Sequence, residues 1–358
     1  MSQLALNIEH RDAAGFCLSI NTEITLTGVT ALFGPSGSGK TTLLNCIAGL
    51  RPDITQASIV FAGEAWQQNN SHAEPWKRSV AYVFQDARLF PHMSVAQNLQ
   101  FAAAHAVTKA PDIAPIARWM AIEALMDRSP DSLSAGQQAR VAIARALMRA
   151  PELLLLDEPL ANLDRSAARE CLACLARINK ENDLPMLYVS HQIEEVSTIA
   201  DHIVLMDKGQ IHQQGPLLEL ASKLDTQLAE DDGAASLLAV EVASRDQDYG
   251  LTELKVDGQS LWVAGDGHTG STRRLRVPAR DVSVCREKPQ GSSIQNILPV
   301  TLQEIRQLSN AHCLLRLQLS QQCLLARITR RSLEDLKLKT GDSLYAQIKS
   351  TALLGDTL

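Results

Sequence analysis

The stretch Gly34-Pro35-Ser36-Gly37-Ser38-Gly39-Lys40-Thr41-Thr42 lies between an apolar run at 29–33 and a helix-like run at 43–50. Its glycines let the backbone curl until several N–H groups point at one phosphate, and the start of a helix adds partial positive charge. Lys40 is predicted to reach the β- and γ-phosphates of a nucleotide, while Thr41 supplies a hydroxyl to Mg²⁺. A merely flexible glycine loop would explain neither the lysine nor the flanking strand and helix. The sequence therefore predicts a phosphate-binding loop, with all of the quoted residues as candidate nucleotide ligands.

A second acidic motif follows the apolar run Leu153–Leu156, where Asp157 and Glu158 stand side by side. A buried strand here would deliver both carboxylates to the sheet edge at which open α/β sheets bind ligands. We expect Asp157 to hold hydrated Mg²⁺ and Glu158 to orient and polarise the attacking water. Two acids at a strand end can also cap the next helix, but the phosphate-binding loop favours the catalytic interpretation.

The segment Leu133-Ser134-Ala135-Gly136-Gln137 precedes a helix-like run. Ser134 and Gln137 have the spacing of a capping box, which predicts a helix N-terminus with free N–H groups suited to a γ-phosphate. Placed about 20 residues before the Asp157 strand, the segment resembles the signature of the ABC ATPase family; an ordinary helix cap is the alternative. In that family the γ-phosphate comes from a second copy, so Ser134, Gly136 and Gln137 are candidate nucleotide ligands of a dimer. Ala135 departs from the usual glycine.

Three further positions match the same family pattern. The resemblance implies that Gln85 contacts Mg²⁺ or the water and leads into a helical subdomain. It implies that Asp164 lies in a loop at the dimer interface near the nucleotide, and that His191 holds the γ-phosphate and the catalytic glutamate. ABC ATPases usually stack adenine on an aromatic side chain before the phosphate loop. Phe16 is the candidate for that role, and it could equally belong to the core.

The composition limits the class of protein. The chain has 358 residues, 45% of them hydrophobic, which is enough for two or three domains with their own cores. A net charge of −6 and an aromatic content of 4% argue against a nucleic-acid partner. No apolar stretch approaches the roughly 20 residues of a membrane span, and no signal peptide is recognisable, so a cytosolic chain is expected.

Seven cysteines, an odd number, fit a reducing compartment better than a disulfide framework. Cys171 and Cys174 form a C-x-x-C in a helix-like run without a second ligand pair. We expect buried helix thiols there; a redox or zinc site is the alternative.

The pattern along the chain predicts an α/β P-loop ABC ATPase core with a helical subdomain, followed by a β-rich C-terminal domain with an OB- or Mop-like barrel. The expected ATPase domain covers 1–228, and its helical subdomain covers about 90–150. That subdomain should begin at a Ser94–Gln97 capping box and break around Pro111 and Pro115. Residues 229–290 are expected to form a linker and a β-rich segment, and 291–358 the barrel.

The C-terminal sequence resembles an oxyanion-binding module of the Mop or TOBE type at two places, 292–298 and 344–350. A tetrahedral dianion such as molybdate has only acceptor oxygens at neutral pH, so a site that binds it needs hydrogen-bond donors and no carboxylates. Ser293, Lys349 and Ser350 meet that need and are candidate oxyanion ligands. Ordinary strand and turn residues of a dimer-forming barrel are the alternative.

The stretches 81–99, 153–164 and 185–191 resemble the ATPase subunits of molybdate importers. The resemblance implies an enzyme that hydrolyses ATP with Mg²⁺ and pairs with a second copy of itself. It further implies integral membrane molybdate permease subunits and, indirectly, a periplasmic molybdate-binding protein. The chain would then sit on the cytoplasmic face of the bacterial inner membrane as a peripheral protein.

Three alternatives stay open at this point. A related importer for sulfate or polyamine shares the same ATPase motifs. An ABC ATPase of DNA maintenance or translation would carry a long coiled-coil insertion or a second cassette, and neither is visible in the sequence. A pure oxyanion-storage module would need no phosphate-binding loop.

Overall fold

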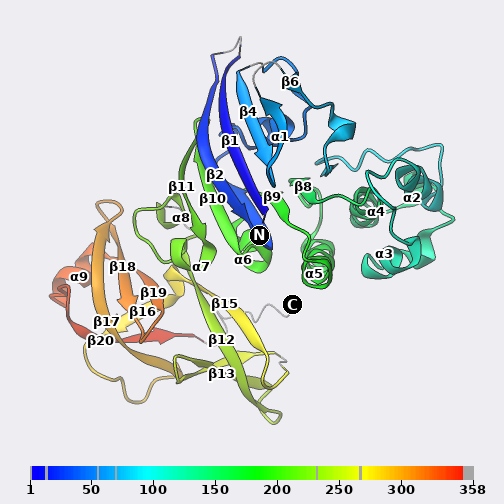
Figure 1. Ribbon diagram of the computed structural model, residues 1–358. Helices are drawn as coiled ribbons and strands as arrows, with labels where there is room; N and C mark the ends of the chain where they lie inside the picture. Colours follow the sequence, from blue (N-terminus) through cyan, green and yellow to red (C-terminus); the bar gives the residue numbers. More distant parts are fainter. Residues whose placement is uncertain are drawn as a thin grey trace. The chain divides into compact units, whose positions relative to one another are not determined.

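A computed structural model describes residues 2–12, 15–54, 56–68, 71–230, 233–265 and 268–349. The chain divides into two compact units, Met1–Gly215 and Pro216–Leu358 (Figure 1). The domain boundaries expected at 228 and 290 stay predictions. In the described ranges no helix is both long and apolar enough to cross a membrane.

The centre of the first unit is a six-stranded sheet in the order β11-β10-β3-β9-β8-β7. Its strands are β3 (Val29–Phe33), β7 (Val80–Val83), β8 (Leu153–Asp157), β9 (Met186–Val189), β10 (His202–Asp207) and β11 (Gln210–Pro216). The strands from β10 to β7 pair in parallel, and every residue of β3, β8 and β9 is buried. The predicted buried parallel sheet is therefore confirmed, and its strands end together at one edge.

A second, antiparallel sheet has the order β2-β1-β4-β5-β6. Its strands are β1 (Ser2–Arg11), β2 (Cys17–Leu26), β4 (Ala57–Phe61), β5 (Glu64–Gln68) and β6 (Ser71–His72). Side chains of this sheet, of α1 (Lys40–Ile47) and of the parallel sheet share one hydrophobic core. That core fixes α1 and the loop before it.

Helices complete the first unit: α2 (Val95–Ala104), α3 (Ile113–Trp119), α4 (Ala135–Leu147), α5 (Arg165–Asn182) and α6 (Ile193–Ile199). Within this unit α2, α3 and α4 gather at one end, away from β1 and β4 (Figure 1). Both halves of the predicted Ser94–Gln97 capping box are present at α2. The predicted break is present between α2 and α3 and contains Pro111, whereas Pro115 lies in the first turn of α3. Its missing N–H has no intrahelical partner to lose there.

Short 3₁₀ turns at Pro75–Lys77, Glu123–Leu125 and Pro130–Ser132 connect these elements. The second unit opens with α7 (Leu217–Leu220) and α8 (Gln227–Glu230). A further 3₁₀ turn at Ala279–Asp281 precedes β16.

The second unit holds two antiparallel sheets, β14-β13-β12-β15 and β16-β20-β17-β18-β19. Their strands are β12 (Ala235–Asp246), β13 (Leu251–Val256), β14 (Gln259–Ala264), β15 (Thr272–Pro278), β16 (Val282–Cys285), β17 (Asn296–Gln307), β18 (His312–Gln318), β19 (Cys323–Thr329) and β20 (Ser343–Ile348). The helix α9 (Arg330–Asp335) follows β19. Apolar side chains of both sheets share one core, and a smaller cluster includes Leu314 and Leu325. The β-rich character is confirmed, and the strands between 235 and 285 are an integral part of this unit.

Candidate functional site

The phosphate-binding loop runs from the end of β3 to the N-terminus of α1. Gly39 caps this helix with φ of 101°, a left-handed conformation that favours glycine. A Cβ at Gly39 would lie 2.8 Å from Cζ of Phe16, and a Cβ at Gly34 would lie 2.1 Å from the carbonyl oxygen of Met206. Close packing against backbone therefore requires glycine at position 34, and the left-handed φ favours it at position 39. The half-buried Phe16 ring packs beside the loop and against the core, so both roles considered for it stay open.

Lys40 is buried at the first turn of α1, with 5% of its surface exposed. Its ammonium donates to the carbonyl oxygens of Gly34 at 2.8 Å and Pro35 at 2.9 Å, and to Oγ of Ser38 at 3.4 Å. Burial lowers the pKa of Lys40, while the carboxylates of Glu158 and Asp157 act in the opposite direction. The loop thus holds a cation next to the acidic end of β8.

Asp157, the last residue of β8, is buried and accepts a hydrogen bond on each carboxylate oxygen. Thr41 Oγ1 donates to Oδ1 at 3.0 Å, and the Tyr82 hydroxyl donates to Oδ2 at 2.8 Å. Burial raises the pKa of Asp157, against the effect of these two donors and of Lys40. The two residues predicted to hold Mg²⁺ through a hydroxyl and a carboxylate are therefore in contact.

Glu158 and His191 meet where β8 and β9 end. Nδ1 of His191 lies 3.3 Å from Oε2 of Glu158, and the side chains are 54% and 23% exposed. The backbone N–H of Glu158 donates to the carbonyl of Val189 at 3.1 Å. Glu158 has φ of 44°. Few residues other than glycine adopt this backbone conformation, and those that do are often found at active sites. The structure thus brings together the predicted water-polarising and γ-phosphate residues.

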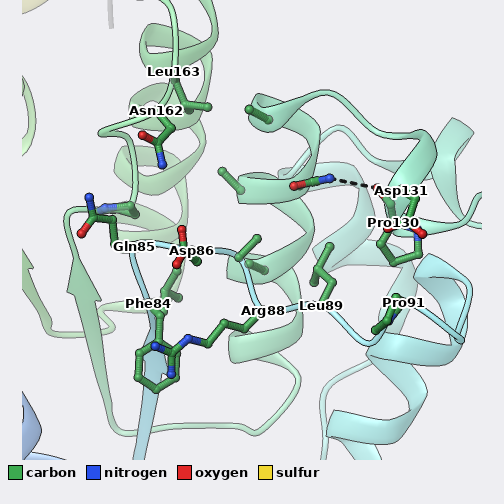
Figure 2. Close-up of a pocket in the computed structure, with 17 residues that line it drawn as sticks. Phe84, Gln85, Asp86, Arg88, Leu89, Pro91, Pro130, Asp131, Asn162 and Leu163 are labelled. Atoms are coloured by element: carbon green, nitrogen blue, oxygen red, sulfur yellow. Dashed lines mark hydrogen bonds between the residues drawn. The ribbon is translucent and has the colours of Figure 1, made fainter.

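Gln85 follows β7 and lines a hollow of about 300 Å³ beside α4. Gln85, Asn162 and Leu163 lie on one side of this hollow, opposite Pro91 (Figure 2). In the described part of the chain no hydrogen bond joins Gln85 to Asp157 or Glu158. The structure therefore places Gln85 at the entrance to the helical region and not against the acidic pair.

The loop after Gln85 is tied to its surroundings by two arginines. The guanidinium of Arg88 stacks 4.0 Å from the centre of the Phe84 ring (Figure 2). Arg145 of α4 donates to the carbonyl oxygens of Arg88 at 2.7 Å and Ala87 at 3.1 Å. The helix that begins at the signature segment therefore holds the loop that carries Gln85.

The predicted capping box at the start of α4 is confirmed. The backbone N–H of Gln137 donates to Ser134 Oγ at 3.3 Å, and the Ser134 N–H donates to Gln137 Oε1 at 3.1 Å. Together with Gly136 and Asp164 they line a second hollow of about 250 Å³. Its other lining residues are Arg140, Ser166, Ala167 and Glu170.

Asp164 and Gly136 also have local roles. Asp164 caps α5, accepting hydrogen bonds from the N–H groups of Ser166 at 2.9 Å and Ala167 at 3.0 Å. A Cβ at Gly136 would lie 2.9 Å from Cβ of Ala167, so the glycine permits close packing of α4 on α5. The exposed Ala135 lines the hollow of Gln85 and not that of Ser134. Its methyl group is therefore not part of the lining that Ser134, Gly136 and Gln137 share.

Three contributors to this site were missed in the sequence. Tyr82 holds Asp157, and Arg145 holds the loop after Gln85. Glu195 of α6 is buried and accepts hydrogen bonds from Tyr188 and Ser190. A hydroxyl or a charge inside an otherwise apolar run was the only available signal, and it does not reveal the partner.

In the second unit the candidate oxyanion ligands lie near one end of two paired strands. Asn296 of β17 pairs with Ile348 of β20. Ser293 shortly before β17 and Lys349 just after β20 therefore lie at the same end of the pair, and both are exposed. Ser350 lies outside the described residues.

The cysteine pair on α5 is part of the helix, as predicted. Cys171 is fully buried, and burial raises the pKa of its thiol to about 12. Cys174 is half-buried, and burial raises the pKa of its thiol as well. Such thiols are poor nucleophiles at neutral pH.

A phosphate loop, an acidic strand end in contact with it and a separate capped signature helix define an ABC-type ATPase. Residues 18–161 match the family described as ABC transporter, and residues 292–354 match the TOBE domain. The solved structure of cbiO1 from Clostridium perfringens, part of the ABC transporter complex cbiONQ, is 29% identical. It covers 63% of this chain and 95% of its own, with a TM-score of 0.53.

A dimeric bacterial ABC transporter cassette shares the fold, with 23% identity, a TM-score of 0.52 and coverage of 61% of this chain and 99% of its own. Among curated proteins, Molybdenum import ATP-binding protein ModC 1 of Azotobacter vinelandii is 43% identical over 350 residues. That match covers 96% of this chain and 97% of the relative. The chain belongs to the family of molybdenum import ATP-binding proteins.

Proposed function

We propose that this chain hydrolyses ATP to energise the import of molybdate through a membrane permease. The identity of 43% over 96% of the chain to a molybdenum import protein carries the proposal, because it spans both units. The ATPase motifs alone would not distinguish cargoes. The chain would act at the cytoplasmic face of the inner membrane, attached through integral permease subunits that receive molybdate from a periplasmic binding protein.

The nucleotide phosphates would bind to the backbone N–H groups of the loop from Gly34 to Thr42. Lys40 supports this role, since it brings a buried cation to the loop and can exchange a carbonyl for a phosphate oxygen. Such a cradle orients the γ-phosphate toward the end of β8. Positioning and charge neutralisation supply most of the catalysis of phosphoryl transfer.

The residues at this edge fit a bound Mg²⁺. Thr41 Oγ1 and Asp157 Oδ1 are hard oxygen ligands in direct contact at 3.0 Å. Burial raises the pKa of Asp157, and a cation bound beside the carboxylate would lower it. A Mg²⁺ ion held there would supply positive charge to offset the negative charge of the phosphates. Thr41 and Asp157 would hold it, with Gln85 approaching from the loop after β7.

Glu158 is the residue that would polarise the attacking water and accept its proton. His191 is close enough to fix the Glu158 carboxylate, and its exposed ring is available to the γ-phosphate. The contact of 3.3 Å between His191 and Glu158 supports this pairing. We therefore assign Glu158 and His191 to the hydrolytic step, and we assign Gln85 to it from the family resemblance alone.

The Ser134 hollow would take the γ-phosphate of a nucleotide bound to a second copy. Its capped helix end carries N–H groups and a Ser134 hydroxyl, the donors that a phosphate needs. Mixing Lys40→Ala chains with Ser134→Arg chains should restore ATP binding at one of the two sites in each heterodimer, because both lesions then fall in the same composite site. Homodimers of either variant should have both sites damaged. No recovery in the mixture would argue against a shared site.

Ser293, Lys349 and Ser350 would give the second unit an oxyanion site. The common strand end of Ser293 and Lys349 supports this proposal, since two exposed donors can converge on one anion there. Equilibrium dialysis of the full chain with molybdate should show weaker binding for Lys349→Ala and unchanged binding for the exposed control Lys288→Ala. Equal binding by all three chains would remove Lys349 from the site.

Uptake by the complex reconstituted in vesicles tests the cargo. Labelled molybdate should accumulate only with ATP, and an excess of unlabelled molybdate, but not sulfate, should compete. ATP-driven accumulation of sulfate without molybdate would instead assign the chain to a sulfate importer. No ATP-driven uptake of either anion would contradict the proposed function.

A further inference from the structure

A buried carboxylate follows His191 closely in the chain and bonds to the end of β9. Glu195, in the first turn of α6, has 7% of its surface exposed. Its Oε2 atom accepts hydrogen bonds from the Tyr188 hydroxyl at 2.7 Å and from Ser190 Oγ at 2.8 Å. One oxygen atom thus ties the helix to the residues on both sides of Val189.

The partners of this acid are neutral. In the part of the chain that the structure describes, no lysine, arginine or histidine forms an ion pair with Glu195. A buried carboxylate with hydroxyl partners only is costly for the fold. Burial and the neighbouring Glu195 raise the pKa of Tyr188 well above its usual range, so its hydroxyl remains a donor.

The bonds of Glu195 reach both members of the pair through the backbone. Ser190 Oγ also accepts a hydrogen bond from the N–H of Gln192 at 3.0 Å, so the residues on both sides of His191 are fixed. Val189, between Tyr188 and Ser190, accepts the hydrogen bond from the N–H of Glu158. A side chain as exposed as His191, with 54% of its surface in solvent, depends on its backbone for its position.

We propose that Glu195 is a positioning residue that acts on hydrolysis through His191. It clamps the turn after β9 so that the imidazole stays at contact distance from the Glu158 carboxylate. This role rests on the proposed function, in which His191 takes part in ATP hydrolysis. It assigns Glu195, Tyr188 and Ser190 to a clamp that does not touch the nucleotide.

A double-mutant cycle on the full chain tests the clamp. Glu195→Ala should lower kcat for ATP by roughly ten- to hundredfold, because small displacements of a catalytic group have effects of that size. The KM for ATP should change little. Glu195→Gln should recover most of the activity, since its amide oxygen can accept both hydroxyl donors. Glu194→Ala, an exposed acid in the same helical turn, is the matched control and should leave kcat unchanged.

The cycle is completed with His191→Ala. This variant should itself lower kcat, and adding Glu195→Ala to it should cause no further loss. If Glu195→Ala lowers kcat by the same factor in both backgrounds, its effect is general to the fold and the clamp is overturned. Normal turnover of His191→Ala alone would instead remove His191 from the proposed hydrolytic step and overturn the clamp with it. If Glu195→Ala does not fold, the same comparison is made with Tyr188→Phe and Ser190→Ala.

Discussion

Asp157 of the first unit and Glu253 of the second are both acids with hydrogen-bond donors, yet their pKa values move in opposite directions. Burial dominates at Asp157 and raises its pKa, although Tyr82 and Thr41 donate to it. Glu253 accepts hydrogen bonds from Ser260, Lys255 and Ser244, which lower its pKa to about 2. One acid is held at a cost to the folded state, and the other stabilises it.

The opposite pKa shifts distinguish a carboxylate suited to ligand binding from one that stabilises the fold. A group whose charged form is destabilised in the folded chain is a candidate ligand for a cation or substrate, because binding can relieve that cost. A group whose charged form is stabilised by its neighbours already has its partners. The comparison therefore places the chemistry at the end of β8, and it can be tested one carboxylate at a time.

The largest effect is expected for Glu158→Gln. Removal of the water-polarising carboxylate should lower turnover by a factor on the order of 10² or more while ATP binding is retained. Steady-state phosphate release and nucleotide binding measure the two quantities separately. Glu152→Gln is the matched control, since Glu152 is exposed and lies just before the other end of β8. Near-normal turnover of Glu158→Gln would contradict its assignment.

Asp157→Asn should make the nucleotide-free chain more stable. It removes a buried charge, and gains of about 0.5–2 kcal/mol in the free energy of unfolding are typical of stabilising changes. The folded-state pKa of Asp157 is raised, so the wild-type carboxylate becomes neutral as pH falls through that pKa. The advantage of Asp157→Asn in the free energy of unfolding should therefore shrink at low pH. Urea unfolding of both chains in EDTA measures this difference in the free energy of unfolding. Asp164→Asn, at an exposed helix cap where both residues serve equally, should be nearly neutral; destabilisation by Asp157→Asn would overturn the comparison.

Tyr82→Phe should weaken the hold on Asp157 without removing the charge. We expect the Mg²⁺ concentration for half-maximal binding of a fluorescent ATP analogue to rise roughly three- to tenfold, less than the full value of a hydrogen bond to a charged group. The analogue's affinity without Mg²⁺ should stay the same. Tyr249→Phe, at a 79% exposed tyrosine, provides the control. An unchanged Mg²⁺ requirement would show that Thr41 alone positions the carboxylate.

Glu253→Gln should have the smallest effect and the opposite sign to Asp157→Asn. The folded-state pKa of Glu253 is lowered, so its stabilisation is present above the unfolded-state pKa and is lost as pH falls toward about 2. The variant should be less stable by about 1 kcal/mol or less at pH 7, a difference that shrinks below roughly pH 4.5. Thermal unfolding against pH, with the exposed Glu241→Gln as control, measures this. A loss that grows on acidification would contradict the sign.

The sequence predicted the elements that depend on local chemistry. The capping boxes at Ser94 and Ser134 were predictable because both partners lie within one helical turn. The glycine loop, the buried parallel strands and the acids at the end of β8 follow from patterns that span a few residues. The roles assigned to Glu158, His191 and Gln85 stay predictions until they are measured.

Contacts between distant segments could not be predicted in the same way. Tyr82 and Asp157 lie 75 positions apart, and nothing in either strand shows that their side chains meet. Ala135 lines the hollow of Gln85 and not that of Ser134, a result of how α4 packs that its sequence does not show. The shared core of the second unit likewise joins residues as far apart as Leu238 and Ile348.

Molybdate uptake and phosphate release measured together in the same vesicles test the central claim most directly. Complexes that carry the wild-type chain or Glu152→Gln should couple ATP hydrolysis to molybdate accumulation. Complexes that carry Glu158→Gln should bind ATP and lose both activities together. Molybdate accumulation that continues in the Glu158→Gln complex without phosphate release would contradict the claim that hydrolysis at the end of β8 drives import.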